Sequence, residues 1–274
     1  MKQVKYMHFN SSCSFTALAF ILAEKGIETE DTEIVREAGL PWIFSREGKR
    51  FLTGPMLQGE KWFDLYLNPR GLCMREERVE RERLPEYLQA HKLCMIGLRL
   101  PGHSGKHAVV MKQKEDKYFV FFNPVREGSG QAAEIRLTEE ELTGSADPVT
   151  VAGVVTQFEG MPCRNKLTEE SLSVLEGNYR EIEQFCRETH TTEEYDKAMD
   201  DLFRALLLDG ITMLELTEET ELAEAFRKEQ RGLLAFMKGD RTGLLAEYIS
   251  LERLKAAAEE YGRVIQKHCL KHCF

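Results

Sequence analysis

The stretch that decides the fold is HFNSSCSFTALAF, residues 8–20, where a cysteine follows three polar residues at the expected start of a helix. Asn10, Ser11 and Ser12 offer turn and capping groups, and the apolar residues after them recur at helical spacing up to Gly26. A thiol at a helix N-terminus lies at the positive end of the helix dipole, which favours the thiolate. Cys13 is therefore either a nucleophile or a small core residue.

Composition and charge narrow the class of protein. The chain has 274 residues, of which 42% are hydrophobic and 30% charged, as in a soluble protein of one large or two modest domains. No apolar run approaches the roughly 20 residues of a membrane span, and the opening MKQVKYMHF lacks the apolar core of a secretory signal. Seven irregularly spaced cysteines argue against a disulfide framework and for a reducing cytoplasm. The net charge of −9 argues against nucleic-acid binding.

The net charge and the spacing of apolar residues both change near residue 165. The residues after this point carry nearly all of the net negative charge and show four amphipathic helical patterns, which predict an all-α helical bundle over residues 164–274. Its role is open, with a protein partner as one option. Residues 1–163 contain short helical patterns followed by strand-like runs such as LCMIGLRL, KHAVVMKQ and KYFVFFNP. Helices followed by strands predict an α+β domain with an antiparallel sheet.

In one segment of residues 1–163, the apolar residues follow neither helical nor strand-like spacing. Residues 41–62 are rich in glycine, proline and aromatic residues, which predicts a long, shaped loop. Trp42, Phe44, Phe51 and Trp62 either line a substrate groove or fix the loop to the rest of the protein.

A histidine and an asparagine give the cysteine its candidate partners. His107 begins the strand HAVVM directly after a glycine-rich loop, and Asn123 ends the next strand. If these strands pair around a turn centred near residue 115, His107 and Asn123 lie side by side. The asparagine oxygen can then accept a hydrogen bond from one ring nitrogen while the other nitrogen faces a thiol. This spacing favours the catalytic interpretation of Cys13.

These features together resemble the papain-like cysteine peptidase superfamily. HFNSSCSFTALAFILAEKGI, EAGLPWIF, GKHAVVM and FFNP are most similar to double-glycine leader peptidases and to the N-terminal domain of butirosin biosynthesis protein H, over about residues 5–160. The resemblance implies Cys13 as nucleophile, His107 as base and Asn123 as the orienting residue, where leader peptidases more often have Asp. It also implies a peptide or an acyl-carrier thioester as substrate.

One position departs from this family. Papain-like peptidases have a glutamine about six residues before the cysteine, which donates to the oxyanion, whereas this chain has Met7. Losing such a donor costs on the order of a hundredfold in rate. His8 and Asn10 are the candidate substitutes, although Asn10 is equally well explained as a turn or cap residue. Without a substitute, the protein is a weak or inactive enzyme.

No other motif predicts a cofactor. The chain has no phosphate-binding glycine motif and no dinucleotide fingerprint, so we expect none. The tail QKHCLKHCF places His268, Cys269, His272 and Cys273 at helical spacing, which fits either a zinc site or the frayed end of a helix.

Two functions remain open. The first is a thiol-dependent acyl-transfer enzyme, either a cysteine peptidase or amidase, or an acyltransferase, that uses a Cys–His–Asn triad. The alternative is a papain-like module that has lost turnover and binds a peptide or protein partner.

Overall fold

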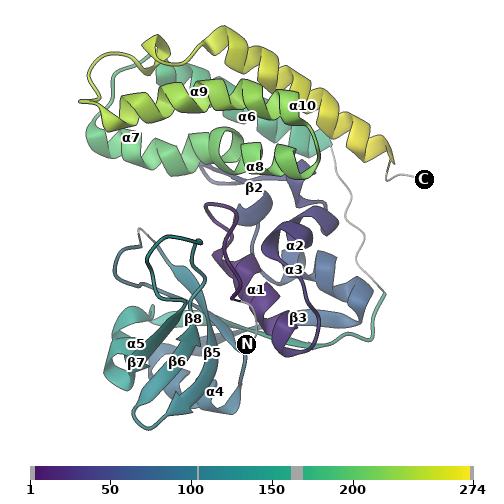
Figure 1. Ribbon diagram of the computed structural model, residues 1–274, viewed down its shortest axis with the longest axis vertical. Coiled ribbons are helices and arrows are strands. Elements are labelled where there is room, and N and C mark those ends of the chain that lie inside the picture. Colours follow the sequence, from purple (N-terminus) through teal and green to yellow (C-terminus); the bar gives the residue numbers. More distant parts are fainter. Residues whose placement is uncertain (1–3, 104, 162–168, 272–274) are drawn as a thin grey trace. The chain divides into compact units, whose positions relative to one another are not determined.

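We describe a computed structural model of the chain over residues 4–103, 105–161 and 169–271, with side chains up to residue 268. The chain forms two compact units, which are described separately (Figure 1). The first contains Met1–Ala38 and Gln58–Arg164, and the second contains Gly39–Leu57 and Asn165–Phe274. Within the described residues, no helix combines the length and apolar character that a membrane span requires.

The first unit is built on a six-stranded antiparallel sheet with the strand order β3-β8-β4-β5-β6-β7. The predicted α+β class with an antiparallel sheet is therefore confirmed. The strands are β3 (Leu72–Glu80), β4 (Met95–Leu98), β5 (His107–Glu115), β6 (Tyr118–Phe122), β7 (Glu134–Thr138) and β8 (Val149–Gln157). The helices are α1 (Cys13–Glu24), α2 (Asp31–Glu37), α3 (Glu60–Leu67), α4 (Leu84–Ala90) and α5 (Glu139–Ser145), with the short 3-10 helices η3 (Asn68–Arg70) and η4 (Arg81–Arg83).

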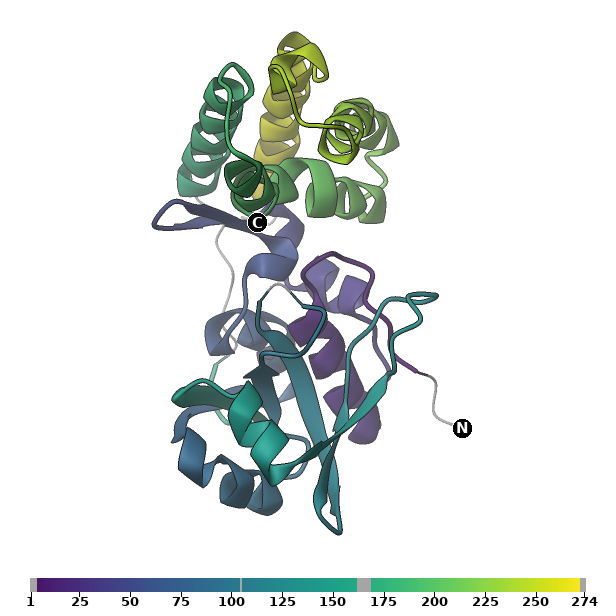
Figure 2. The same ribbon diagram turned by 90° about the vertical axis from the view of Figure 1, so that its left-hand side faces the viewer.

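Helices cover both faces of this sheet (Figure 2). Along β6, Phe119 and Phe121 belong to a core that also contains Leu84 of α4 and Leu142 of α5. On the opposite face α1 packs against β5, and Phe20 stacks on Phe122 of β6 at 4.2 Å between ring centroids. Because side chains alternate along a strand, consecutive aromatic residues of β6 serve the two cores.

Helix α1 is the most buried helix of this unit. Its residues from Ser14 to Ala19 are all buried, as are Ile21 and Leu22. The helix ends at Glu24, and Gly26 follows with φ of 85°, a conformation that glycine adopts without steric cost. A helix that is apolar on nearly all sides is held in place by its neighbours, so the position of Cys13 at its first turn is well defined.

The second unit contains the predicted C-terminal helices. They are α6 (Glu169–Cys186), α7 (Thr192–Ala198), the π-helix η5 (Met199–Leu208), α8 (Asp209–Leu216), α9 (Thr220–Lys238), the 3-10 helix η6 (Leu245–Glu247) and α10 (Leu251–Lys271). Their apolar faces meet in one core that includes Leu175, Phe226 and Tyr261.

Residues 39–57 fold with these helices. They form η1 (Leu40–Trp42), the hairpin of β1 (Phe44–Glu47) and β2 (Arg50–Thr53), and η2 (Gly54–Met56), where the sequence predicted a long loop. Trp42 and Phe44 contact the ring of Tyr261, whose hydroxyl donates to the Pro41 carbonyl at 3.0 Å. The aromatic residues of this segment therefore fix it to the helical core, which was one of the two interpretations of its composition.

We expect the substitution Phe51→Ala to destabilise the helical unit. Phe51 is fully buried in the core of that unit, and truncating a buried phenylalanine costs about 3–5 kcal/mol. Hydrogen exchange followed by mass spectrometry should show faster exchange in α6 and unchanged exchange in the sheet. The matched control is Phe121→Ala, which removes an equally buried ring from the sheet core and should have the reverse effect. Faster exchange of the sheet alone in Phe51→Ala would contradict the assignment of this segment.

Candidate active site

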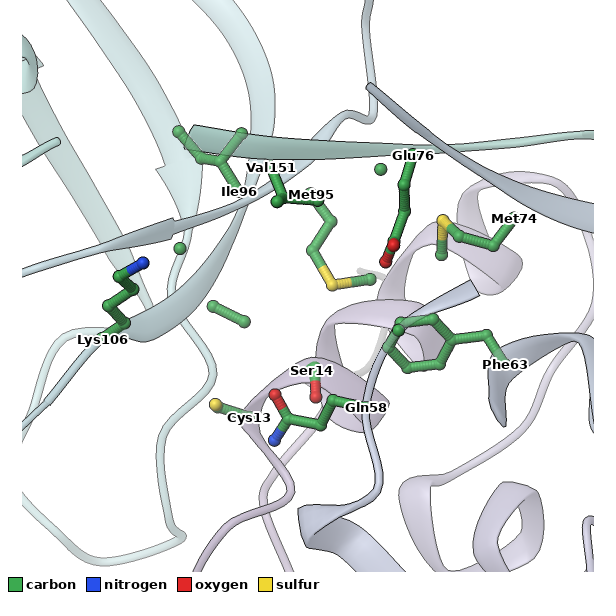
Figure 3. A pocket seen from close by; sticks show the side chains of 14 residues that line it. Cys13, Ser14, Gln58, Phe63, Met74, Glu76, Met95, Ile96, Lys106 and Val151 are labelled. Atoms are coloured by element: carbon green, nitrogen blue, oxygen red, sulfur yellow. The ribbon is translucent and has the colours of Figure 1, made fainter. Parts of the chain in front are cut away.

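Cys13 is the first residue of α1 and its thiol is half-buried. It lines a cavity of about 190 Å³ that belongs entirely to the first unit (Figure 3). The cavity walls come from α1, from α3 and the segment before it, and from the strands β3, β4, β5 and β8 with the residue before β5. Most of the lining is apolar, with Phe63, Met74, Met95, Ile96 and Val151, and the polar members are Ser14, Gln58, Glu76 and Lys106.

Two of the other described thiols, those of Cys94 and Cys186, lie in different surroundings. Burial raises the pKa of Cys94 and that of Cys186 to about 12. Both side chains are buried, whereas Cys13 is half-buried at a helix N-terminus. Cys13 is therefore the described cysteine whose surroundings best suit a nucleophile.

A buried carboxylate fixes the start of α1. Asp31 is fully buried and accepts four hydrogen bonds from the segment around Cys13. Two come from His8, through its backbone N–H at 2.9 Å and Nδ1 at 2.6 Å. The others come from the hydroxyls of Ser12 at 2.6 Å and Thr16 at 3.2 Å. Asp31 thus links the residues before Cys13 to the first turns of α1.

This network sets the protonation of His8. The hydrogen bond to Asp31 raises the pKa of the imidazole, and partial burial opposes this effect. Half of the His8 side chain is exposed, and His8 is not among the residues that line the Cys13 cavity. The role of His8 as an oxyanion donor therefore remains a prediction. The structure shows His8 bonded to Asp31, which is a structural role.

His107 lies at the start of β5 and its side chain is buried. Its Nε2 donates to the carbonyl of Pro124 at 2.8 Å, so the neutral ring carries its proton on Nε2 and has a lone pair on Nδ1. The ring also lies 4.1 Å from that of His103, centroid to centroid. Burial, followed by the charge of His103, lowers the pKa of His107 to about 4. The imidazole is therefore neutral at neutral pH.

Asn123 lies on the same face of the sheet as His107, but the two residues are not direct partners. Val110 pairs with Phe122, and a bulge lies between Met111 and Gln113. Continuing this ladder sets Asn123 opposite Val109, so His107 is offset by two residues from the predicted pairing. Because Glu115 pairs with Tyr118, the turn is centred between residues 116 and 117 and not near residue 115, which causes the shift; the bulge reduces it by one residue.

The orientation of the imidazole comes from the residue after Asn123. The Pro124 carbonyl accepts the Nε2 proton, where we predicted the Asn123 side-chain oxygen. Asn123 Nδ2 donates to the Ala132 carbonyl at 2.8 Å, and its buried Oδ1 has no hydrogen-bond partner of good geometry among the described residues. The Asn123 side chain still opposes the fall in the His107 pKa, which places the carboxamide near the ring.

The cavity brings Cys13 next to the neighbours of His107. Lys106 and Ala108 line the cavity together with Cys13, whereas His107 itself does not. Side chains alternate along extended backbone, so a residue between two that line the cavity is directed to the other face. His107 is the first residue of β5.

The remaining predicted site residues lie outside the cavity lining. Arg126 donates a short hydrogen bond to Asn10 Oδ1, and the Met7 backbone N–H donates to the Val125 carbonyl at 2.9 Å. Gln58, which the sequence analysis did not select, lines the cavity beside Cys13. A single glutamine in an irregular segment carries no sequence signal, and only the fold shows that it is near the thiol.

The C-terminal tail is described in part. His268 stacks on Trp42 at 4.2 Å between ring centroids and lies 3.9 Å from a Glu219 oxygen. The Cys269 side chain, His272 and Cys273 lie outside the described residues. Among the described residues, no group of three or more metal-binding side chains comes together.

Comparison with known proteins gives structural similarity alone. No protein-family model and no curated protein matches the chain. The chain is similar to the peptidase domain of Streptococcus ComA, a bifunctional ABC transporter involved in a quorum-sensing pathway, with 11% identity and a TM-score of 0.41 over 57% of this chain and 99% of that one. It is also similar to a double-glycine motif protease from an AMS/PCAT transporter in complex with the leader peptide, with 19% identity and a TM-score of 0.38 over 55% of this chain and 89% of that one. The similarity to double-glycine motif peptidase domains that the motifs indicated is thus shown, and at these identities it concerns the fold.

We expect His107 and His8 to affect the pH dependence of stability in opposite directions. Folding lowers the His107 pKa from 6.5 to about 4, so between these values the unfolded state binds the proton more readily. Stability from this group is therefore lost as the pH falls through this window. The His8 pKa is raised, so its contribution is present below 6.5 and is lost as the pH rises through the higher folded value.

Urea unfolding of His107→Gln and His8→Gln at several pH values tests these signs. Trp62 fluorescence in a Trp42→Phe background reports on the sheet unit, which contains Trp62. His107→Gln should flatten the acidic limb, and His8→Gln should remove stability at low pH. An unchanged acidic limb in His107→Gln would show that the buried imidazole is not held neutral.

Proposed function

We propose that the chain is a thiol-dependent acyl-transfer enzyme in which Cys13 is the nucleophile and His107 the general base. The observation that carries this proposal is the cavity of the first unit, where the half-buried Cys13 at the N-terminus of α1 meets the residues on both sides of His107. A nucleophile, a base and a concave apolar site are the parts that acyl transfer to a thiol requires.

The hydrogen bonds of His107 suit a base. Because Nε2 donates to the Pro124 carbonyl, Nδ1 is the nitrogen that can receive a proton. The lowered pKa keeps the ring neutral at neutral pH, so it is in the form that accepts the thiol proton. In the proposed step, the Cys13 proton moves to Nδ1 as the sulfur attacks the carbonyl carbon of the substrate. The bond from that carbon to the leaving amine or thiol then breaks, and Nδ1 returns the proton to this leaving group, which gives the acyl-Cys13 thioester. Asn123 acts by holding Pro124 and the ring in position.

The products follow from the fate of the acyl-Cys13 thioester. Transfer to water makes the protein a peptidase or an amidase, and transfer to an amine makes it an acyltransferase. A peptide and an acyl-carrier thioester are the two donor classes that the resemblance to papain-like peptidases implies. The helical unit is a candidate surface for a protein partner.

Two observations favour a second function, a module that binds a peptide or a protein partner without turnover. His107 is not among the residues that line the Cys13 cavity, and Met7 has no side-chain donor at the position where related peptidases have glutamine. In this case the cavity binds a ligand, and Cys13 is an ordinary half-buried thiol. The reactivity of Cys13 distinguishes the two functions.

The test is alkylation by iodoacetamide at about pH 6, where an unperturbed thiol is mostly protonated. Peptide mass spectrometry should find Cys13 modified before Cys94 and Cys186, whose pKa values are raised, and before the cysteines of the C-terminal tail. His107→Ala should slow this modification by about tenfold or more, because the base is lost, and Asn123→Ala should slow it less.

A control variant separates reactivity from folding. His91→Ala changes a histidine at the end of α4, whose ring bonds to the backbone of its own helix, and it should alkylate like the wild type. If Cys13 reacts no faster than the tail cysteines, or if His107→Ala leaves its rate unchanged, the binding module is the better description.

A further inference from the structure

Two charged side chains line the Cys13 cavity, those of Glu76 and Lys106. Lys106 forms an ion pair with Asp147, which lies outside the lining. Glu76 remains in contact with water and has no ion pair with any residue that the structure describes. The cavity therefore contains a negative charge without a counter-ion in the described parts of the chain, and the proposed chemistry does not use it.

The register of the sheet directs the Glu76 side chain to the cavity. Glu76 of β3 pairs with Gly153 of β8, which also lines the cavity. The next residue, Glu77, pairs with Ala152, which belongs to the core on the other face of the sheet. Because side chains alternate along a strand, the two carboxylates lie on opposite faces. Figure 3 shows the Glu76 carboxylate directed into the cavity.

Two further carboxylates make this end of the cavity more negative. Partial burial raises the pKa of the Glu76 carboxyl, and the nearby charges of Glu60 and Asp64 add to this effect, whereas a hydrogen bond from the Glu60 backbone N–H opposes it. Arg75 pairs with Glu60 at 3.0 Å, and Asp64 accepts from the Met74 backbone N–H at 2.7 Å. A bound cation would stabilise the ionised form of Glu76.

A second, independent feature indicates a ligand in the same cavity. The Ser14 side chain is only 4% exposed, and its Oγ has no hydrogen-bond partner among the described residues. A buried hydroxyl without a partner is destabilising and requires an explanation. Ser14 lines the cavity, and Figure 3 shows it on the same wall as Cys13. A polar atom of a bound ligand would satisfy this hydroxyl.

The size and the remaining walls of the cavity indicate which part of a substrate enters it. The other walls are mainly apolar, with Phe63, Met74 and Met95 among them, and the volume of about 190 Å³ is below the roughly 300 Å³ at which sites for drug-sized ligands begin. The cavity therefore has room for one short chain. Because an acyl group is bonded to the Cys13 sulfur, this chain is the acyl group, and the water or amine that accepts it approaches from outside.

From these observations we infer that the Cys13 cavity selects an acyl group with a positive charge, such as an ω-aminoalkanoyl chain, and that Glu76 binds this charge. The inference rests on the proposed function, because it specifies the acyl group that Cys13 receives, and it applies to either class of donor. An ammonium and a carboxylate form a charge-assisted hydrogen bond, which is stronger than one between neutral groups. A neutral chain of the same shape leaves Glu76 without a counter-ion.

The test compares p-nitrophenyl esters in two matched pairs. The 3-aminopropanoyl and 6-aminohexanoyl esters carry a terminal ammonium, and the butanoyl and heptanoyl esters have a methyl group in its place, so that a short and a long reach to Glu76 are both tested. In each case Cys13 Sγ attacks the ester carbonyl, its proton goes to His107 Nδ1, and p-nitrophenolate leaves with the bonding electron pair. Stopped-flow absorbance of p-nitrophenolate gives the acylation rate, and Cys13→Ser gives the background.

In at least one pair, the wild type should acylate from the ammonium ester about tenfold or more efficiently than from its methyl counterpart. Glu76→Gln keeps the shape and an acceptor oxygen but removes the charge, so it should reduce this preference to about twofold or less. The rates with the methyl esters should be unchanged. Because the preference is a ratio measured within one variant, it does not depend on the fraction of the protein that is folded.

Glu77→Gln is the matched control. It removes the same charge from the next residue of β3, which faces away from the cavity and does not line it. This variant should keep the wild-type preference. If Glu76→Gln also keeps it, or if the wild type acylates equally within both pairs, the recognition role is overturned while the proposed function stands. If none of the four esters acylates the wild type, the recognition role is again overturned, and the proposed function falls with it if Cys13 alkylates no faster than the tail cysteines.

Discussion

The four hydrogen bonds to the buried Asp31 carboxylate are the constraint on which the candidate site depends. A carboxylate without exposure to water is tolerated only when its oxygens are satisfied, and here His8, Ser12 and Thr16 satisfy them. These residues lie on both sides of Cys13 in the sequence. Asp31 itself begins α2, so one side chain joins the N-terminal segment, the first turns of α1 and the next helix. Any change that removes it should release the thiol from its fixed position.

The proposed site differs from one in which Cys13 and His107 form a thiolate–imidazolium ion pair before the substrate binds. Burial and His103 hold the imidazole of His107 in the neutral state, and the Pro124 carbonyl fixes which nitrogen carries the proton. A neutral base takes the thiol proton during attack, whereas an imidazolium would stabilise a thiolate beforehand. The proposed enzyme therefore depends on the position of His107 more than on its charge.

Much of the fold could be predicted because its signals are local. Apolar spacing predicted α1 and the C-terminal helices, and the strand-like runs KHAVVMKQ and KYFVFFNP predicted β5 and β6. Two strands were missed: β3 is a sheet edge with charged residues such as Arg75 and Glu77, which resembles a solvated loop, and β7 has the same mixed character. The hairpin at residues 44–53 was missed because its aromatic residues pack on helices far away in the sequence.

In the candidate site, too, local sequence signals identified some residues, and others depend on contacts between distant segments. Cys13, His107 and Asn123 were selected as candidates from their predicted places at the ends of elements, which sequence reveals. The Pro124 carbonyl, the Asp31 network and Gln58 were not found, because a backbone acceptor has no sequence signature and the other two depend on contacts between distant segments. The two-residue offset between His107 and Asn123 came from the position of the turn, which lies between residues 116 and 117, and a bulge that sequence does not reveal reduced it by one residue.

The central claim is that Cys13 forms an acyl intermediate with His107 as its base. The most direct measurement is intact-protein and peptide mass spectrometry after brief exposure to N-acetylglycine p-nitrophenyl ester, with rapid acid quenching. The account predicts one acyl group, located on Cys13, that accumulates in the wild type and is nearly absent in His107→Ala. An unmodified Cys13, or equal acylation in the two proteins, would contradict it.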